Sequence, residues 1–462
     1  MHYRIALIVA LGFLLASLTA DANEPTLSVL VEEDVYAVPE ANNGAGATWC
    51  YGSTVIARID SEVFLTELEV VPTAQPLNNC QWNLSVRRAN GWQRLHADRP
   101  NRTREPSPIA VFPDSREIFV SANPTLVADP EKYSGPARPQ VVRFHDSNHT
   151  FEPTTLLPRW NGEPPFTEHS YRSFAADGFR RELILFQNIG YTHTEWAFRD
   201  RSGNWSATGK LDWQWGADYA KPQPIRICYP TVALVDQKVF FCGVSDIIEP
   251  NPQWAEFKKE LTGRAWDYDF RRLFFTWTDD ITKGEFHPWI EISSREETCG
   301  WIMPNDLYVD PEGAVHLLWS ERAIDTRLRE KFFPEAKQSE ALCYALVREG
   351  KVLKRSDVMI RHENEGKPVA QTGRFHVTPD NRLWVVCYIR GREGEHTVSE
   401  NRIVEIKNGA PAGVFRTIPL EKPFSSFFTA TIRAGNKPSA ILDLHGTSPN
   451  SNSLRYAAIK LD

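Results

Sequence analysis

The chain has 462 residues and a formal net charge of −7, with 52 Lys and Arg against 59 Asp and Glu. An acidic protein repels a phosphate backbone, so the charge argues against nucleic acid as a partner. Hydrophobic residues make up 42% of the chain, and the 32 Pro and 15 Trp beside only 3 Met favour many short strands joined by turns over a helical protein.

The first 22 residues have the composition of a secretory signal peptide. A short basic start precedes an apolar run over residues 5–18, and an Ala-Asp-Ala sequence then supplies a small-x-small cleavage pattern. The apolar run is shorter than the roughly 20 residues of a membrane-spanning helix. We therefore expect residues 1–22 to be removed and residues 23–462 to form one secreted domain, periplasmic or extracellular, that is monomeric and does not insert into a membrane.

Seven cysteines follow the expected cleavage point, in a compartment where disulfides persist. We expect the pairs Cys50–Cys80 and Cys228–Cys242, because each falls within one proposed repeat. At least one cysteine must then stay unpaired in a monomer. Since no Cys or His spacing suggests zinc, we expect no metal or other cofactor at the functional site, although a structural calcium ion is compatible with the sequence.

One pattern recurs seven times along the chain: an apolar strand, a tight polar turn and a second apolar strand. The turn contains an Asp in six copies and Gly435 in the seventh. The spacing of the copies matches one four-stranded propeller blade plus loops of variable length. The seven hairpins begin at Thr54, Pro108, Ser173, Thr231, Asp306, Arg374 and Thr429.

Further strand-turn-strand segments lie between these hairpins and supply the outer two strands of each blade. After the seventh hairpin only the strand from Leu454 to Leu461 remains, whereas residues 26–32 form a lone strand before the first hairpin. Pairing these two strands closes the ring and removes both open edges. The sequence therefore predicts an all-β fold, a seven-bladed β-propeller closed by its terminal strands, with six and eight blades as alternatives.

The connections of such a propeller differ between its two faces. If the strands of a blade are A to D from the inside out, the A–B and C–D turns share one face and the B–C and D–A connections share the other. Long loops usually carry function, so we expect the site in the cup that the B–C connections build. These long connections are residues 122–138, 245–270, 321–339 and 390–400, with helical segments expected over 253–262 and 322–333.

Residues at the starts of A strands and the ends of B strands are expected to face this cup. We expect His169, Tyr171 and Tyr229 to be catalytic, because His and Tyr side chains transfer protons. His169 and Tyr171 are two apart on a predicted strand and would share one face. Arg suits a sugar carboxylate and Trp a sugar ring. The expected substrate-binding residues are Arg172, Asn188, Arg226, Trp301, Asn305 and Arg374. The alternative for each of these residues is a structural role, either in packing or, for the arginines, in ion pairs that hold loops together.

Two segments resemble the sialidase-like propellers with BNR or Asp-box repeats. Phe198 to Trp205 (FRDRSGNW) is similar to a degenerate Asp-box turn, and Asp310 to Gly313 (DPEG) begins a hairpin typical of that group. The likeness of fold spans nearly all of the chain after the leader. These motifs have low specificity, so the resemblance implies a propeller rather than a particular activity.

Within that superfamily the chain resembles the seven-bladed polysaccharide lyases that cleave ulvan-type uronic-acid polymers. Those enzymes carry a His shortly before an Asp-Gly turn and a Tyr-Pro at the start of the next blade. Here His169 precedes Asp177-Gly178, and Tyr229 is followed by Pro. A second His and an Arg of the family correspond to Asn188 and Ser245. The resemblance implies β-elimination on an acidic polysaccharide, provided that Arg226, Arg172 or Arg374 takes over the neutralising role.

Two other functions are compatible with the same residues. A sialidase-type glycoside hydrolase needs three arginines, which Arg172, Arg226 and Arg374 would supply, and a Tyr nucleophile, which Tyr229 would supply. The Phe-Arg-Ile-Pro signature of that family is missing. The third function is a non-catalytic propeller that binds a glycan or a protein.

Overall fold

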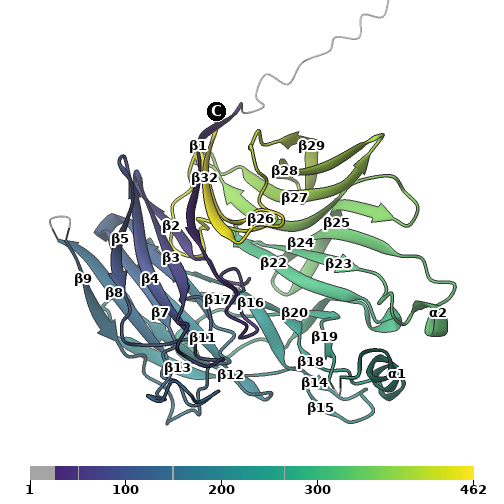
Figure 1. Ribbon diagram of the computed structural model, residues 1–462, viewed down its shortest axis with the longest axis horizontal. Helices are drawn as coiled ribbons and strands as arrows, with labels where there is room; N and C mark the ends of the chain where they lie inside the picture. The colour runs from purple at the N-terminus through teal and green to yellow at the C-terminus, as the bar shows by residue number, and fades with distance from the viewer. Residues whose placement is uncertain (1–25, 50, 148–149, 265) are drawn as a thin grey trace, which may run out of the picture.

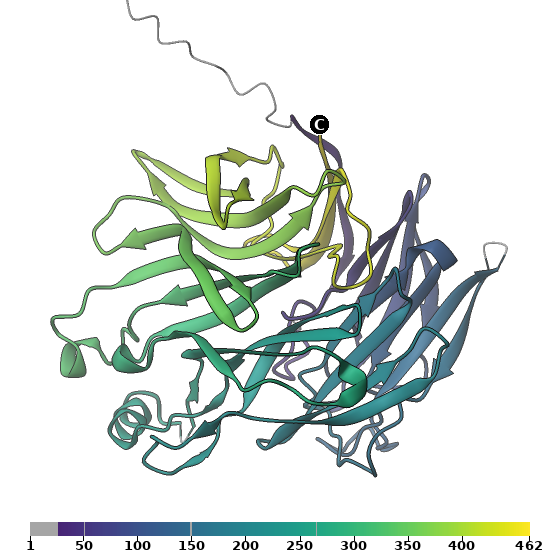
Figure 2. The same ribbon diagram turned by 180° about the vertical axis from the view of Figure 1, so that it is seen from behind.

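The computed structural model describes residues 26–462 except 50, 148–149 and 265 (Figures 1 and 2). The expected leader and Cys50 lie outside the described residues. Seven four-stranded antiparallel sheets form a ring. Their inner strands contact one another in the order β2, β6, β10, β16, β22, β26, β30 and back to β2. The predicted seven-bladed β-propeller is confirmed.

Blades 1 to 3 follow one another directly in the chain. Their second strands are almost wholly buried, because neighbouring blades pack on both faces of each sheet. Blade 1 contains β2 (Ile56–Ile59), β3 (Glu62–Val70), β4 (Cys80–Arg88) and β5 (Gly91–Ala97). Blade 2 contains β6 (Ile109–Phe112), β7 (Glu117–Ala122), β8 (Gln140–Ser147) and β9 (Thr150–Leu156), and blade 3 contains β10 (Ser173–Asp177), β11 (Glu182–Ile189), β12 (His193–Arg199) and β13 (Trp205–Asp212).

Blades 4 to 6 repeat this arrangement, with longer strands in blades 5 and 6. Apolar side chains of adjacent sheets interlock between them and form the largest core cluster at the interface of blades 4 and 5. Blade 4 contains β16 (Ile227–Val235), β17 (Lys238–Ser245), β20 (Arg272–Thr278) and β21 (Ile290–Ser294). Blade 5 contains β22 (Trp301–Val309), β23 (Val315–Arg322), β24 (Ser339–Arg348) and β25 (Lys351–His362), and blade 6 contains β26 (Val369–Val377), β27 (Leu383–Glu393), β28 (His396–Lys407) and β29 (Ala410–Thr417).

Blade 7 joins the two ends of the chain. It contains β30 (Ser426–Thr429), β31 (Ile441–Thr447) and β32 (Ser453–Leu461), and its outermost strand is β1 (Leu27–Ala37). β1 pairs antiparallel with β32 along its whole length, and Figure 1 shows the two side by side. The predicted closure is confirmed, and the N-terminal strand is longer than the predicted 26–32.

The connections between strands hold the few other elements. The helix expected over 253–262 is confirmed as α1 (Pro252–Thr262). The helix expected over 322–333 is limited to α2 (Arg329–Phe332), and the expected loop over 390–400 is wrong, because β27 and β28 extend through it as one long hairpin. No helix in the described part of the chain is long and apolar enough to span a membrane. The short elements are β14 (Trp215–Gly216), β15 (Gln223–Pro224), β18 (Ile247–Ile248), β19 (Tyr268–Asp269), η1 (Pro113–Ser115), η2 (Ile281–Lys283) and η3 (Glu296–Thr298).

The seventh hairpin is not the tight turn that the sequence predicts. After β30, residues 430–440 form an irregular segment, here called the plug, that bonds to inner-strand groups of blades 1, 2, 3, 5 and 6. Gly435 has φ 85° and an added Cβ would lie 2.0 Å from the Val111 carbonyl oxygen, so only glycine fits there. The bonds join Arg58 N to Asn436 Oδ1, Val111 N to Ala434 O, Ala176 N to Arg433 O, Arg433 Nε to Asp306 Oδ1, and Ser439 N to Val377 O.

The predicted Cys228–Cys242 disulfide is wrong, because both residues carry free thiols. Cys242 packs in the core between blades 4 and 5, whereas the Asn188 amide of blade 3 lies 3.6 Å from Cys228 Sγ. The two side chains therefore point to opposite faces of the blade 4 sheet. The other predicted pair, Cys50–Cys80, involves a residue outside the described part of the chain.

Candidate functional site

The D–A and B–C connections lie on one face of the ring, which we call the cup face; the A–B and C–D turns lie on the opposite turn face. This follows from the antiparallel order of every blade. The cup-face connections that carry the candidate residues are 38–55, 157–172 and 213–226 between blades, and 123–139, 190–192 and 246–271 within blades 2, 3 and 4.

Four aromatic rings pack together at the starts of the inner strands of blades 1, 3 and 4, and a fifth comes from the connection before β20. Tyr229 is central, with its ring centroid 5.3 Å from that of Trp49 and 5.6 Å from that of Tyr51. It also lies 5.4 Å from Tyr171, which is 4.9 Å from Trp49. Phe270 adds a ring 6.0 Å from Tyr229. The fold thus brings together two of the three predicted catalytic residues.

Tyr171 and Tyr229 occupy corresponding, strained positions. Tyr171 lies just before β10 with φ 43°, and Tyr229 lies in the bulged start of β16 with φ 51°. A left-handed conformation is costly for a bulky aromatic residue and persists only where its surroundings impose it. Residues 169–172 precede β10 rather than belong to it, so the prediction that His169 and Tyr171 share a strand face is wrong.

Arg226 lies among three tyrosines beside this cluster. Its Nε donates to the Asp246 carbonyl oxygen at 2.8 Å, and its Nη2 lies 2.9 Å from the Asp246 carboxylate. The guanidinium carbon is 3.9 Å from the ring centroid of Tyr191, 5.3 Å from that of Tyr171 and 5.4 Å from that of Tyr268. Its Nη1 has no hydrogen-bond acceptor among the described residues. This cation is therefore fixed in place with one donor nitrogen uncommitted.

His169 pairs with the carboxylate of the preceding residue. Its Nδ1 is 2.9 Å from Glu168 Oε1, and Gly135 N donates to Glu168 Oε2 at 3.2 Å. Burial opposes ionisation of Glu168, but these hydrogen bonds, with that from His169 the strongest, hold the pKa of the carboxyl below its ordinary value. An ionised carboxylate only accepts, so Nδ1 of neutral His169 carries the proton and Nε2 presents a lone pair. The imidazole is 43% exposed.

The two strained tyrosines are proton donors rather than bases at neutral pH. Burial raises the pKa of Tyr171 and of Tyr229 well above the ordinary value, and the nearby Asp246 carboxylate raises both further. Their hydroxyl groups therefore stay protonated. The connection that carries His169 and its neighbours therefore offers one imidazole and two protonated hydroxyl groups.

Two predicted binding residues, Asn305 and Arg374, bond to protein groups near the plug. Arg374 Nε donates to the Phe427 carbonyl oxygen at 3.0 Å, and its Nη1 donates to the carbonyl oxygens of Tyr51, at 2.8 Å, and of Asn305. The Asn305 amide accepts from Gly373 N at 2.9 Å. Burial lowers the pKa of Arg374 to about 10. Both residues join blades 1, 5, 6 and 7.

Arg172 and Asn188 are also buried and bonded to neighbouring backbone. Arg172 Nη2 donates to the Pro106 carbonyl oxygen at 2.7 Å, and its Nη1 donates to Ser170 Oγ at 3.2 Å. Asn188 Nδ2 donates to the Ile227 carbonyl oxygen at 3.1 Å. These bonds link blade 2 to blade 3 and blade 3 to blade 4.

The three arginines of the hydrolase alternative do not converge on one point. Arg172 and Arg374 donate to backbone carbonyls of different blades, and only Arg226 reaches the aromatic cluster. Trp301 begins β22 opposite Arg322 and is half-buried, with no ring contact to the cluster among the described residues. The geometry therefore gives no support to an arginine triad.

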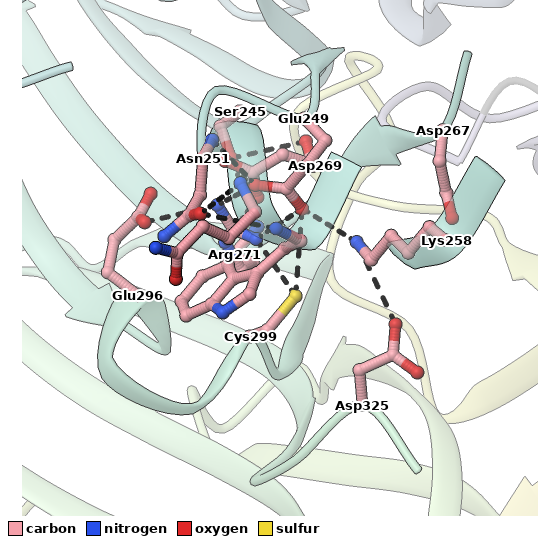
Figure 3. Close-up of polar contacts among 12 residues, drawn as sticks. Ser245, Glu249, Asn251, Lys258, Asp267, Asp269, Arg271, Glu296, Cys299 and Asp325 are labelled. Carbon is pink, nitrogen blue, oxygen red and sulfur yellow. Dashed lines mark hydrogen bonds and ion pairs between the residues drawn. The ribbon is translucent and has the colours of Figure 1, made fainter. Parts of the chain in front are cut away.

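A buried ion network anchors the connection that carries Tyr268 and Phe270 (Figure 3). Arg271 is its centre. Its guanidinium lies 2.8 Å from Glu249, 3.0 Å from Asp269 and 3.1 Å from Glu296. A buried arginine with several carboxylate partners has a single well-defined position. This network therefore fixes the backbone that carries Tyr268, one of the three tyrosines around Arg226.

The same network joins blade 4 to blade 5. Lys258 of α1 lies 2.6 Å from Glu249 and 3.8 Å from Asp325, which belongs to the long connection of blade 5. Figure 3 shows Lys258 between these two carboxylates. The long connections on this side of the cup are therefore held as one rigid wall.

Sequence reasoning did not identify Asp246, Tyr268 or Arg104 as part of the site. Arg104 lies with its guanidinium carbon 5.1 Å from the Trp49 ring centroid. Only the position of Asp246 directly after a predicted B strand offered a signal, whereas Tyr268 and Arg104 come from connections whose path the sequence does not define. Within the described residues no group of three or more His, Cys, Asp and Glu side chains is arranged to hold a metal ion.

No family model and no curated protein matches the chain. Among solved structures, the fold is similar to that of the polysaccharide lyase Uly1, with a TM-score of 0.50 and 11% identity over 95% of this chain and 100% of that one. It is also similar to a protein of unknown function from Dyadobacter fermentans (TM-score 0.44, 9% identity, 94% of this chain and 99% of that one) and to the α-L-arabinofuranosidase Arb93A from Fusarium graminearum (TM-score 0.44, 10% identity, 94% and 98%). At 11% identity the likeness to Uly1 concerns the fold alone.

Proposed function

We propose that the protein is a secreted carbohydrate-active enzyme that cleaves a uronic-acid-containing polysaccharide by β-elimination at the cup face. The observation that carries this proposal is that one cup-face connection carries both an exposed imidazole, His169, and Tyr171, whose ring packs against Tyr229 and the Arg226 guanidinium. Elimination needs these three functions: a base, an acid and a cation for the substrate carboxylate.

The proposed reaction begins at the uronate ring. Arg226 pairs with the ring carboxylate through Nη1 and thereby lowers the pKa of the C5 proton. His169 Nε2 removes that proton, the released electron pair forms the C4–C5 double bond, and the C4–O bond breaks. Tyr229 donates its proton to the departing oxygen. Glu168 stabilises the imidazolium that His169 becomes, as a carboxylate does for histidine in other proton-transfer sites.

This assignment gives the base and acid roles to different residues because of their surroundings. Tyr229 keeps its proton at neutral pH because its pKa is strongly raised and so has no free base form to offer, whereas His169 has its Nδ1 fixed by an ionised carboxylate. In this proposal Arg172, Asn188, Asn305 and Arg374 support the scaffold instead of binding substrate, since their polar groups bond to the protein. Trp301 has no role in it.

The test is the appearance of an unsaturated product from ulvan. Wild-type protein is expected to raise the ultraviolet absorbance of an ulvan solution, and His169→Ala and Tyr229→Phe are each expected to lower kcat by roughly 10²- to 10⁴-fold, the usual contribution of a positioned acid or base. His287→Ala is the matched control, because His287 is a 40% exposed histidine with a carboxylate partner on the turn face.

Several results would overturn the proposal. Products without a double bond would identify a hydrolase, and polymer binding with no turnover would identify a binding protein. Wild-type rates in both site variants would place the reaction elsewhere in the molecule.

A further inference from the structure

Exposed aromatic side chains gather on one arc of the cup face. Among the described residues, four exposed Tyr and Trp side chains lie in cup-face connections, and all four come from blades 2 to 4. These are Tyr133 (64% exposed), Tyr191 (45%), Trp215 (55%) and Trp266 (57%). Water-exposed aromatic rings are costly, and a group of them on one surface marks a binding site.

Backbone hydrogen bonds connect the segment that carries the first of these residues, Tyr133, to the residue that pairs with the proposed base. The Tyr133 carbonyl oxygen accepts from Leu77 N at 2.5 Å, which holds this connection against blade 1. Two residues later, Gly135 N donates to the Glu168 carboxylate that also bonds His169. Tyr133 is therefore held in a fixed relation to the histidine on the side of blade 2.

Backbone hydrogen bonds likewise connect the segment that carries Trp215 to Arg226, the proposed partner of the substrate carboxylate. Trp215 belongs to the small ribbon of β14 and β15, in which it pairs with Pro224. Ile225 N donates to the Gln214 carbonyl oxygen at 2.8 Å, and Arg226 follows directly. The ribbon therefore fixes Trp215 relative to Arg226.

Tyr191 lies between these two supports. One side of its ring is covered by the Arg226 guanidinium at 3.9 Å, and its hydroxyl lies 3.0 Å from that of Tyr268. A ring that is covered on one side and still 45% exposed presents its other side to solvent. The arc thus contains rigid aromatic surfaces on both sides of the proposed catalytic residues.

We propose that Tyr133, Tyr191, Trp215 and Trp266 are platforms on which successive sugar rings of one polysaccharide chain stack, so that the chain lies across blades 2 to 4. A rigid aromatic ring offers a broad flat contact at low conformational cost, and its polar edge suits a partner that is itself part apolar and part hydroxyl. Exposed cations lie close in the sequence to two of the platforms, with Lys132 directly before Tyr133 and Arg264 two residues before Trp266. That the bound polymer is acidic rests on the proposed function, whereas the stacking of its sugar rings on the platforms does not.

The experiment measures binding of ulvan by affinity electrophoresis in the Tyr229→Phe background, which prevents turnover. Trp215→Ala and Tyr133→Ala are expected to weaken ulvan binding roughly fivefold to tenfold each, the scale of a lost aromatic contact. Trp215→Phe keeps a flat ring and is expected to retain most of the affinity, whereas Trp215→Leu keeps only the apolar bulk and is expected to lose it.

Phe179→Ala is the matched control, since Phe179 is 91% exposed but lies in the A–B turn of blade 3 on the turn face. It is expected to bind ulvan as tightly as the parent protein. If Trp215→Ala and Tyr133→Ala bind ulvan as tightly as Phe179→Ala, the platforms are overturned. An equal loss of ulvan affinity in Trp215→Phe and Trp215→Leu overturns them as well. Arabinan serves as a neutral polymer, and equal affinity for both polymers rejects an acidic substrate.

The platforms and the proposed function fail separately. If ulvan binds through Trp215 but is never cleaved by the wild-type protein, the platforms stand and the elimination does not. If the wild-type protein cleaves ulvan and Trp215→Ala leaves KM for ulvan unchanged, the elimination stands and the platforms do not. A wild-type protein that binds neither polymer overturns the platforms outright.

Discussion

Two buried arginines near the inner strands, Arg433 at the plug and Arg226 at the cup face, look equivalent by burial and charge but differ in their partners. Arg433 pairs with buried Asp306 and donates to the Gly52 carbonyl oxygen, so it ties blade 7 to blades 5 and 1. Arg226 pairs with Asp246 and stacks on tyrosines, and its Nη1 is uncommitted within the described part of the chain. Burial of a charge therefore does not identify a functional site; Arg226 is the candidate because it lies at the cup face among tyrosines.

The largest expected effect comes from breaking the pair at the plug. Arg433→Met leaves Asp306 buried without its partner and is expected to lower the free energy of unfolding by about 3–5 kcal/mol. Lys437→Met is the control in the same segment, because its bond to Asp114 is exposed and is expected to contribute less than about 1 kcal/mol. Urea unfolding measures both. Equal losses would show that the plug does not depend on its buried ion pair.

The second largest effect is expected from acid, which lowers the free energy of unfolding through a histidine bonded to the plug. Burial lowers the pKa of His376 to about 4, and this histidine donates from Nε2 to the Ser439 carbonyl oxygen of the plug at 2.8 Å. The unfolded chain takes up the proton first, so stability is full above about pH 6.5 and falls until about pH 4. The loss is about 3 kcal/mol, at about 1.4 kcal/mol per pKa unit.

His376→Gln keeps a donor for Ser439 without a titrating group. Its free energy of unfolding is expected to fall less steeply between pH 6.5 and pH 4 than that of the wild type. Some slope remains, because burial also lowers the pKa of His445 to about 4. An unchanged slope would show that His376 does not contribute to acid sensitivity.

The smallest effect is expected at the cup face. Glu168→Gln removes the charge behind His169 while keeping the size of the side chain, and is expected to lower kcat on ulvan roughly tenfold to hundredfold with KM unchanged. Glu163→Gln, an exposed residue of the same connection, is the control. A change in KM alone would assign Glu168 to substrate binding instead of to positioning of the histidine.

The sequence predicted the architecture better than the site, for a physical reason. Alternating apolar strands and their turns recur locally, so seven hairpins and the β1–β32 closure are visible in one chain. The positions of Arg374 and Asn305 depend on which backbone carbonyls surround them, and these come from blades distant in sequence. The plug was missed because Gly435 in a short polar stretch is equally typical of a tight turn.

The aromatic cluster shows the same limit. Tyr171 and Tyr229 were found because each stands directly before a recognisable strand, whereas Tyr268 and Arg104 lie in irregular connections whose path is set by tertiary bonds. The Cys228–Cys242 prediction failed because closeness along the chain says nothing about which face of a sheet each thiol occupies.

The pairing of β1 with β32 has a consequence for how the molecule assembles. Val29 meets Ile459 across a sheet, so two segments separated by almost the whole chain must find each other before blade 7 is complete. Contacts of this kind are made late, since closing so long a loop costs entropy that local contacts do not. Until then β32 has an unpaired edge that other strands can occupy, and the time spent in that state sets the exposure of the newly made protein to aggregation.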